Sequence, residues 1–174
     1  MKIIAAAALA LGLTGCAGIQ VERYQNEKPV LDLKTYFNGT IDGVGMFQDR
    51  SGAVIKRFHV VITARWEGEV GTLDEQFAWS DGTRSQRVWT ITKHDANRYT
   101  GRAPDVIGEA EGKASGNALR WQYVLDLPVE GGKTYHVDFD DWMFLMDDKV
   151  MLNKSAMSKW GFHLGEVTLS FTKR

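Results

Sequence analysis

The stretch Val54-Ile55-Lys56-Arg57-Phe58-His59-Val60-Val61-Ile62-Thr63-Ala64-Arg65-Trp66-Glu67 alternates between apolar and polar side chains. Every second residue from Phe58 to Trp66 is apolar, and the opposite parity includes Arg57, His59, Thr63 and Arg65. A period of two places all of the apolar side chains on one face of an extended chain. Residues 54–67 are therefore predicted to form a long β-strand with one face on a core.

The rest of the chain from Thr40 onward repeats this pattern in short runs rich in β-branched and aromatic residues. We expect about eight to ten strands, because turn signals separate the runs at regular intervals. Tight turns pair consecutive strands antiparallel, and a long meander avoids exposed edges most simply by closing. The expected fold is thus all-β, a single antiparallel β-barrel. The turn signals are Asp49–Gly52, Glu67-Gly68, Ser80–Thr83, Asp95–Asn97, Ser115–Asn117, Glu130–Gly132 and Asp147-Asp148.

A short helix is predicted just before the first strand. Leu33, Tyr36 and Phe37 have helical spacing, and Asp32 precedes them as an N-cap candidate. Asn38-Gly39 is a typical C-terminal stop. We expect one or two turns that cover one end of the barrel.

The N-terminus carries the signs of a lipoprotein signal peptide. Lys2 is followed by the apolar segment Ile3 to Leu13, which is too short to span a bilayer. Leu13-Thr14-Gly15-Cys16 resembles the lipobox of bacterial lipoproteins, which implies cleavage before Cys16 and its acylation. Cys16 is the only cysteine, and the alternative is a buried free thiol. Under the sorting rule of that class, Ala17 implies the periplasmic face of the outer membrane.

The expected domain organisation follows from this signal. Residues 1–15 are the signal peptide, 16–29 the lipidated N-terminus and a polar tether, and 30–174 the barrel domain. The 159 residues that remain after cleavage carry 20 basic and 22 acidic side chains. No basic excess indicates a nucleic-acid partner, and a lone cysteine provides no disulfide framework. Stability is therefore expected to come from packing of the many aromatic residues.

Residues 135–146 break their own alternation. Tyr135, Val137 and Phe139 share one parity, whereas the apolar residues after Asp140-Asp141 lie on the other. One extra residue near Asp140-Asp141 would restore a continuous apolar face, so we predict a β-bulge there.

The sequence contains no clear pattern of an enzyme active site. His136, Asp138 and Asp140 would share a strand face, but alternate residues lie about 7 Å apart and converge poorly on a metal ion. The histidines show no metal-ligand spacing, and no serine occupies a nucleophile elbow. We expect no catalytic residue, metal or cofactor, and no enzymatic activity. The alternative is a lipid-modifying enzyme built on Asp140, Asp141 and His136.

Arginines interleaved with aromatic residues are the strongest candidates for a binding site. A buried guanidinium can hold a carboxylate or phosphate while aromatic rings cover an acyl chain. On this hypothesis Arg57 and Arg87 hold a polar headgroup. The alternative is that each arginine pairs with a carboxylate such as Asp49, Glu75, Asp105, Asp140 or Asp141 and joins strands. The residues expected to line the cavity are Trp89, Trp121, Tyr123 and Trp142.

Five motifs together resemble a Gram-negative lipoprotein family known as a domain of unknown function and described as lipocalin-like. The resemblance covers about residues 30 to 174 and implies a lipocalin-like barrel. Genes of that family often lie near fatty-acid-modifying enzymes, which implies a lipid ligand. The motifs are Phe47–Gly52, Asp81–Arg84 with Arg87–Trp89, Gly116–Trp121, Asp140–Met143 and Lys159–Gly161.

The sequence therefore leads us to expect a membrane-anchored lipoprotein that binds or carries a fatty acid or other lipid. Its partners would be a hydrophobic small molecule and, through Cys16, the outer membrane. The alternative from another class is a barrel filled by its own side chains, which acts as an envelope structural or protein-interaction module.

Overall fold

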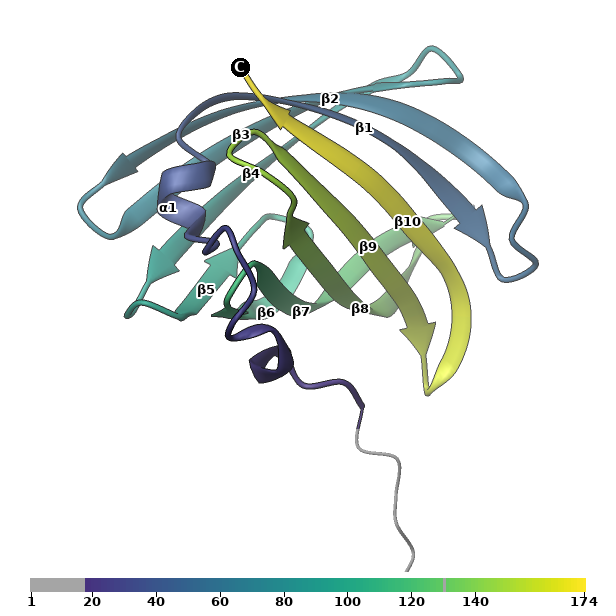
Figure 1. Cartoon of the computed structure of the whole chain (residues 1–174). Coiled ribbons are helices and arrows are strands. Elements are labelled where there is room, and N and C mark those ends of the chain that lie inside the picture. Colours follow the sequence, from purple (N-terminus) through teal and green to yellow (C-terminus); the bar gives the residue numbers. More distant parts are fainter. Residues whose placement is uncertain (1–17, 130) are drawn as a thin grey trace, which may run out of the picture.

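A ten-stranded antiparallel sheet closes on itself in the computed structural model, which describes residues 18–129 and 131–174 (Figure 1). Each strand pairs with its neighbours in the chain, and β1 pairs with β10 to complete the barrel. The predicted all-β barrel is thus confirmed. The strands are β1 (Gly39–Asp49), β2 (Val54–Glu67), β3 (Val70–Trp79), β4 (Arg84–Lys93), β5 (Arg98–Arg102), β6 (Val106–Ser115), β7 (Ala118–Val129), β8 (Lys133–Leu145), β9 (Val150–Lys159) and β10 (Phe162–Lys173).

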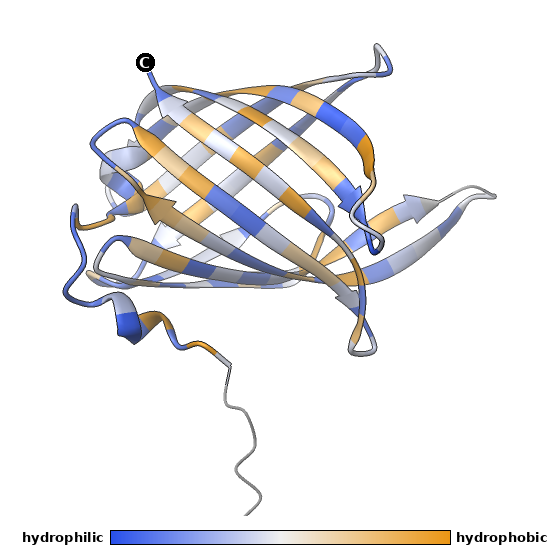
Figure 2. Cartoon of the chain, turned by 45° about the vertical axis from the view of Figure 1, so that its right-hand side comes forward, coloured by the Kyte–Doolittle hydropathy of each residue, from blue (hydrophilic) through white to orange (hydrophobic). Residues whose placement is uncertain are grey.

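Alternation along each strand decides which side chains enter the barrel. Figure 2 shows the result as hydrophobic and hydrophilic bands that cross the strands. In β2 the predicted core residues Val60 and Ile62 are 1% exposed, whereas Arg57 and Arg65 face outward. The predicted turns fix the hairpins. For example, Asp49 Oδ1 accepts hydrogen bonds from the backbone N–H groups of Ser51 and Ala53.

One end of the barrel is closed by the helical turn α1 (Leu33–Tyr36). Asp32 caps it as predicted, because its side chain accepts a hydrogen bond from Thr35 N at 3.0 Å. Trp66 Nε1 donates to the carbonyl oxygen of Phe37 at 2.7 Å and ties the turn to β2. Leu33 and Phe37 are buried over the barrel end, so this end is shut.

The residues before α1 pack on the outer wall of the barrel. The 3-10 turn η1 (Val21–Tyr24) lies on β6 and β7, and Val21 is buried there. The ring of Tyr24 meets Phe144 edge-on, with centroids 5.1 Å apart. This part of the predicted tether therefore lies on the barrel instead of extending from it. No helix among the described residues is long and apolar enough to cross a membrane.

The predicted β-bulge near Asp140-Asp141 is wrong. β8 keeps an unbroken register with β7 and β9 through these two residues. Register shifts occur instead at Phe47/Gln48, in the segment between Ile107 and Glu111, and between His163 and Gly165. Because β8 is regular, Asp141 follows Phe139 into the barrel interior.

Candidate ligand-binding cavity

The side chains do not fill the barrel, and a cavity of about 490 Å³ remains inside it. This volume lies within the range of small-molecule sites. α1 closes one end, so access is from the end that carries the β1–β2, β3–β4, β7–β8 and β9–β10 turns. The alternative of a barrel packed solid by its own side chains is therefore not what the structure shows.

Most of the cavity wall is apolar and aromatic. The ring of Trp89 meets Trp121 and Tyr123 edge-on, with centroids 5.8 and 5.5 Å apart. Trp121 lies over Gly112, where a Cβ would come within 2.2 Å of the indole. Glycine therefore makes the room in which this ring lies flat against the wall. Other apolar residues of the wall include Phe47, Phe58, Leu73, Phe77, Trp79, Ile91, Leu125, Phe139, Met157 and Phe171.

A set of polar side chains crosses this apolar interior, and we call it the polar arc. Its members come from the inner faces of β3, β4, β7, β8 and β9 and from the connection between β5 and β6. They all line the one cavity although the chain separates them by as many as 80 positions. The polar arc consists of Glu75, Arg87, Asp105, Tyr123, Asp141, Asn153 and Ser155.

Within the polar arc, the guanidinium of Arg87 is held by Asp105. Nε and Nη2 of Arg87 donate to Asp105 Oδ2 at 3.0 and 2.6 Å. Both bonds go to one oxygen, and Asp105 Oδ1 is buried with no hydrogen-bond partner among the described residues. Arg87 therefore pairs with a carboxylate of the chain itself, which is the alternative that the sequence left open for each arginine.

Asp141 is the most buried carboxyl of the polar arc, with 6% of its surface exposed. Its Oδ2 accepts a long hydrogen bond of 3.4 Å from the Tyr123 hydroxyl. Its Oδ1 has no partner among the described residues. The hydroxyl of Ser155, across the strand pair from Asp141, donates to Asn153 Oδ1 at 3.2 Å. The Ser155 hydroxyl is close enough to lower the pKa of Asp141, but it donates to Asn153, so Asp141 Oδ1 is left without a donor among the described residues.

Burial raises the pKa of two carboxyls of the polar arc. The pKa of Asp141 rises to about 7, chiefly because desolvation disfavours the carboxylate. The pKa of Glu75 also rises to about 7 through desolvation, although Arg87, opposite it on β4, acts in the other direction. Near neutral pH these two groups exchange protons readily, so the charge of the cavity responds to pH and to what it binds.

The structure brings together four of the six predicted ligand-binding residues. Arg87, Trp89, Trp121 and Tyr123 all line the cavity. Arg57 does not, because Lys56 and Phe58 take the inward positions of β2 and leave Arg57 exposed on the outer face. Cys16, the predicted lipid attachment site, lies outside the described residues.

Trp142 also lies outside the cavity, because the regular register of β8 turns it outward. Its ring stacks on Phe144 with centroids 6.1 Å apart and packs against Tyr24 of the N-terminal segment. Arg120 lies over the same ring at 5.5 Å. Trp142 therefore holds the N-terminal segment on the wall and is corrected as a cavity residue.

The three residues of the lipid-modifying alternative do not converge. Asp140 faces outward and pairs with Arg120 at 2.7 Å. His136 is also outside, with Nε2 3.6 Å from Asp126, while Asp141 alone faces the cavity. Among residues 18–129 and 131–174 no cluster of histidine, cysteine or acidic side chains has the geometry of a metal site.

The sequence did not predict that Glu75, Asp105, Asn153 and Ser155 line the cavity. Glu75 had a readable signal, because it shares strand parity with Leu73 and Phe77. An isolated acid within an apolar parity is a polar group placed in a core. Asp105 had no such signal, because it lies in a connection whose direction the alternation does not fix.

These features define a class: a closed antiparallel β-barrel with one shut end, an apolar cavity and a few buried polar groups. Within that class, residues 10–173 match the family described as a protein of unknown function, DUF3833, and the chain belongs to that family. No curated protein sequence matches the chain.

Two solved structures show the same fold at low sequence identity. The S-type phycobiliprotein lyase CPES from Guillardia theta is 7% identical, with a TM-score of 0.61 over 90% of this chain and 98% of the lyase. A protein of unknown function from the DUF3598 family of Nostoc punctiforme is 10% identical, with a TM-score of 0.52. That match covers 91% of this chain and 53% of the other, so this chain spans about half its length. The lipocalin-like architecture is thereby confirmed.

Proposed function

We propose that the protein binds a hydrophobic small molecule, a fatty acid derivative or other lipid, inside the barrel. The observation that carries the proposal is the cavity itself, about 490 Å³ and lined mostly by apolar side chains. An unfilled cavity is unfavourable to the fold, because its lining forgoes packing contacts. An apolar ligand would supply those contacts, and the polar arc would orient its polar end.

The likeness to a phycobiliprotein lyase supports the barrel as a frame for such a cavity and does not identify the ligand. Asp141 and Glu75, whose pKa values lie near 7, would also suit proton transfer to a bound molecule. Binding is the function that we propose, since it needs only the geometry described above.

We further propose that the protein acts at a membrane surface, attached through an acylated Cys16 at the periplasmic face of the outer membrane. The tip of the β9–β10 hairpin supports this proposal, because Trp160 and Phe162 are 84% and 73% exposed there. The Nζ of Lys159 lies over the Trp160 ring at 4.9 Å. Exposed aromatic rings beside a lysine are typical of segments that enter a bilayer interface.

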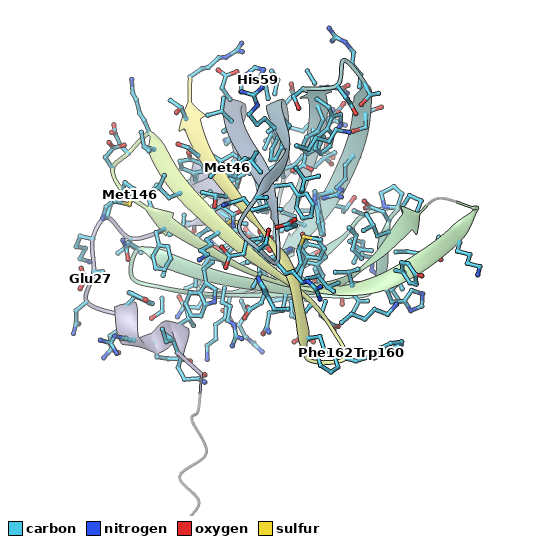
Figure 3. The ribbon with its side chains drawn as sticks, turned by 90° about the vertical axis from the view of Figure 1, so that its right-hand side faces the viewer. Glu27, Met46, His59, Met146, Trp160 and Phe162 are labelled. Carbon is cyan, nitrogen blue, oxygen red and sulfur yellow. The ribbon has the colours of Figure 1, made fainter. Side chains whose placement is uncertain are left out.

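This hairpin and the described start of the N-terminal segment lie on the same side of the barrel. In Figures 1 and 2 the β9–β10 tip and the described start of the chain both point to the lower side of the barrel. Figure 3 shows Trp160 and Phe162 at that lower tip, with their side chains away from the barrel body. An anchor at Cys16 would therefore bring the two rings toward the membrane that holds it.

The ligand is best sought by mass spectrometry of what the protein carries. Residues 18–174 contain every strand and the turn that closes the barrel, so this span is exported and purified without detergent. An unrelated exported barrel, prepared identically, serves as the control. A lipid enriched at about one per chain over the control supports the proposal. A chain that yields no enriched lipid, even after incubation with total membrane lipids, contradicts it.

A further inference from the structure

The carboxyl groups of the cavity outnumber its basic groups, and the basic groups are already engaged. Lys56 and Arg87 are the basic side chains of the described lining. Lys56 Nζ pairs with Asp81 of the β3–β4 turn at 2.7 Å, and Arg87 pairs with Asp105 at 2.6 Å. Arg87 also lies opposite Glu75, so this one guanidinium is shared between Glu75 and Asp105, and Asp141 adds a third interior carboxyl.

The polar arc also contains buried oxygens that can still accept hydrogen bonds. Asp141 Oδ1 and Asp105 Oδ1 are both buried and receive no hydrogen bond from the described residues. Asp141 is more than nine-tenths buried and lies in the cavity wall. Buried acceptors are normally satisfied, so these oxygens call for a donor from a bound molecule.

From this arrangement, and resting on the proposed binding function, we propose that the ligand carries an amine, bound as an ammonium by Asp141 and Glu75. An ammonium supplies up to three N–H donors to the unpartnered oxygens and positive charge to the surplus carboxyls. A carboxylate or phosphate would bring further negative charge to an interior whose guanidinium is taken. The ligand class is thus an amphipathic amine with an apolar chain along the aromatic wall.

This assignment replaces the acid-binding role that the sequence suggested for Arg87. Arg87 is a positioning residue here, because its two hydrogen bonds to Asp105 fix that side chain on one side of the polar arc. Removing the Asp105 carboxyl is then expected to release the guanidinium toward the cavity. That single change should therefore weaken the preference of the site for a cation.

Three ligands with the same ten-carbon chain test the proposal: decylamine, decanol and decanoate. Each displaces an uncharged fluorescent apolar probe from residues 18–174 at pH 8, below its micelle concentration. Decylamine should bind about tenfold more tightly than either of the others, the gain expected from a charge-assisted hydrogen bond. Equal or tighter binding of decanoate or decanol overturns the proposal. Failure of the probe and all three ligands to bind overturns the underlying binding function instead.

Matched variants locate the preference in the polar arc. Asp141→Asn and Glu75→Gln should each remove most of the tenfold preference for decylamine over decanol. Asp105→Asn should reduce the preference for decylamine over decanoate, because the released guanidinium then attracts the carboxylate while Glu75 and Asp141 remain. Asp140→Asn is the control, because Asp140 is adjacent on β8 but faces outward to Arg120. If Asp141→Asn fails to fold, the Glu75→Gln result decides. A tenfold preference for decylamine that is undiminished in both Glu75→Gln and Asp105→Asn overturns the proposal.

Discussion

Asp141→Asn is expected to make the stability of the barrel less dependent on pH. The pKa of Asp141 is about 7 in the folded chain, against an ordinary value of 3.8. A carboxyl whose folded pKa is raised stabilises the fold only while it stays protonated. Its contribution is therefore fully present below about pH 4 and is lost as the pH rises through 7.

The size of the effect follows from the shift in pKa. Each unit of difference between the folded and unfolded pKa corresponds to about 1.4 kcal/mol. The shift of Asp141 therefore corresponds to about 4 kcal/mol lost between acid and pH 8. Asparagine keeps the shape and has no charge to bury, so the variant should escape this loss. Glu75 remains and contributes a slope of its own in both proteins.

The measurement is urea unfolding of residues 18–174, followed by tryptophan fluorescence, at pH 5, 7 and 9. Between pH 5 and 9 the wild type should lose about 2 to 3 kcal/mol more free energy of unfolding than Asp141→Asn. Asp140→Asn is the matched control and should keep most of the wild-type slope, because its carboxyl lies outside, pairs with Arg120 and adds only a secondary contribution to the raised pKa of Asp141. Parallel pH profiles for the wild type and Asp141→Asn would refute the account of a carboxyl buried against its ionisation.

Three further predictions test the packing, the closed end and the membrane-facing tip. Gly112→Ala should lower the free energy of unfolding by about 1 to 3 kcal/mol in urea, because its Cβ must displace Trp121; an unchanged stability contradicts the close packing. Asp32→Ala should lower it by about 1 to 2 kcal/mol through loss of the helix cap, and no loss would mean that the turn is held by packing alone. Joint replacement of Trp160 and Phe162 by serine should reduce vesicle binding several-fold in a flotation assay while urea stability stays within about 0.5 kcal/mol, since both rings are exposed; undiminished vesicle binding contradicts the membrane-facing role.

The fold could be read from the sequence because its signal repeats. Alternation recurs in most of the strands and turn residues separate them, so one misjudged strand does not change the architecture. The cap of α1 was equally readable, since Asp32 and Asn38-Gly39 act locally. Local rules suffice wherever the interaction itself is local.

The sequence predicted only part of the site, for a physical reason. Alternation assigns a side chain to a face but assumes that an inner face is apolar. That assumption moved the apolar parity of β8 at Asp140-Asp141 and produced a predicted bulge that the register does not contain. The same assumption placed Trp142 in the cavity and left Asp141 out of the predicted cavity residues. The partner of Arg87 could not be chosen either, because Asp105 approaches it through the fold and not through the chain.

The polar arc sets stability and binding against each other. Ten strands can close around apolar side chains alone, and replacing buried charges by well-packed apolar groups is often neutral or stabilising. At neutral pH the barrel instead retains Glu75 and Asp141 in a desolvated interior, with pKa values near 7. Asp141→Asn should therefore stabilise the fold above pH 7 and weaken amine binding at the same pH. A substitution that raises stability and weakens binding is expected at a binding site, because groups that destabilise the fold are retained there for function. A structural ion-pair network would give the same sign in both measurements.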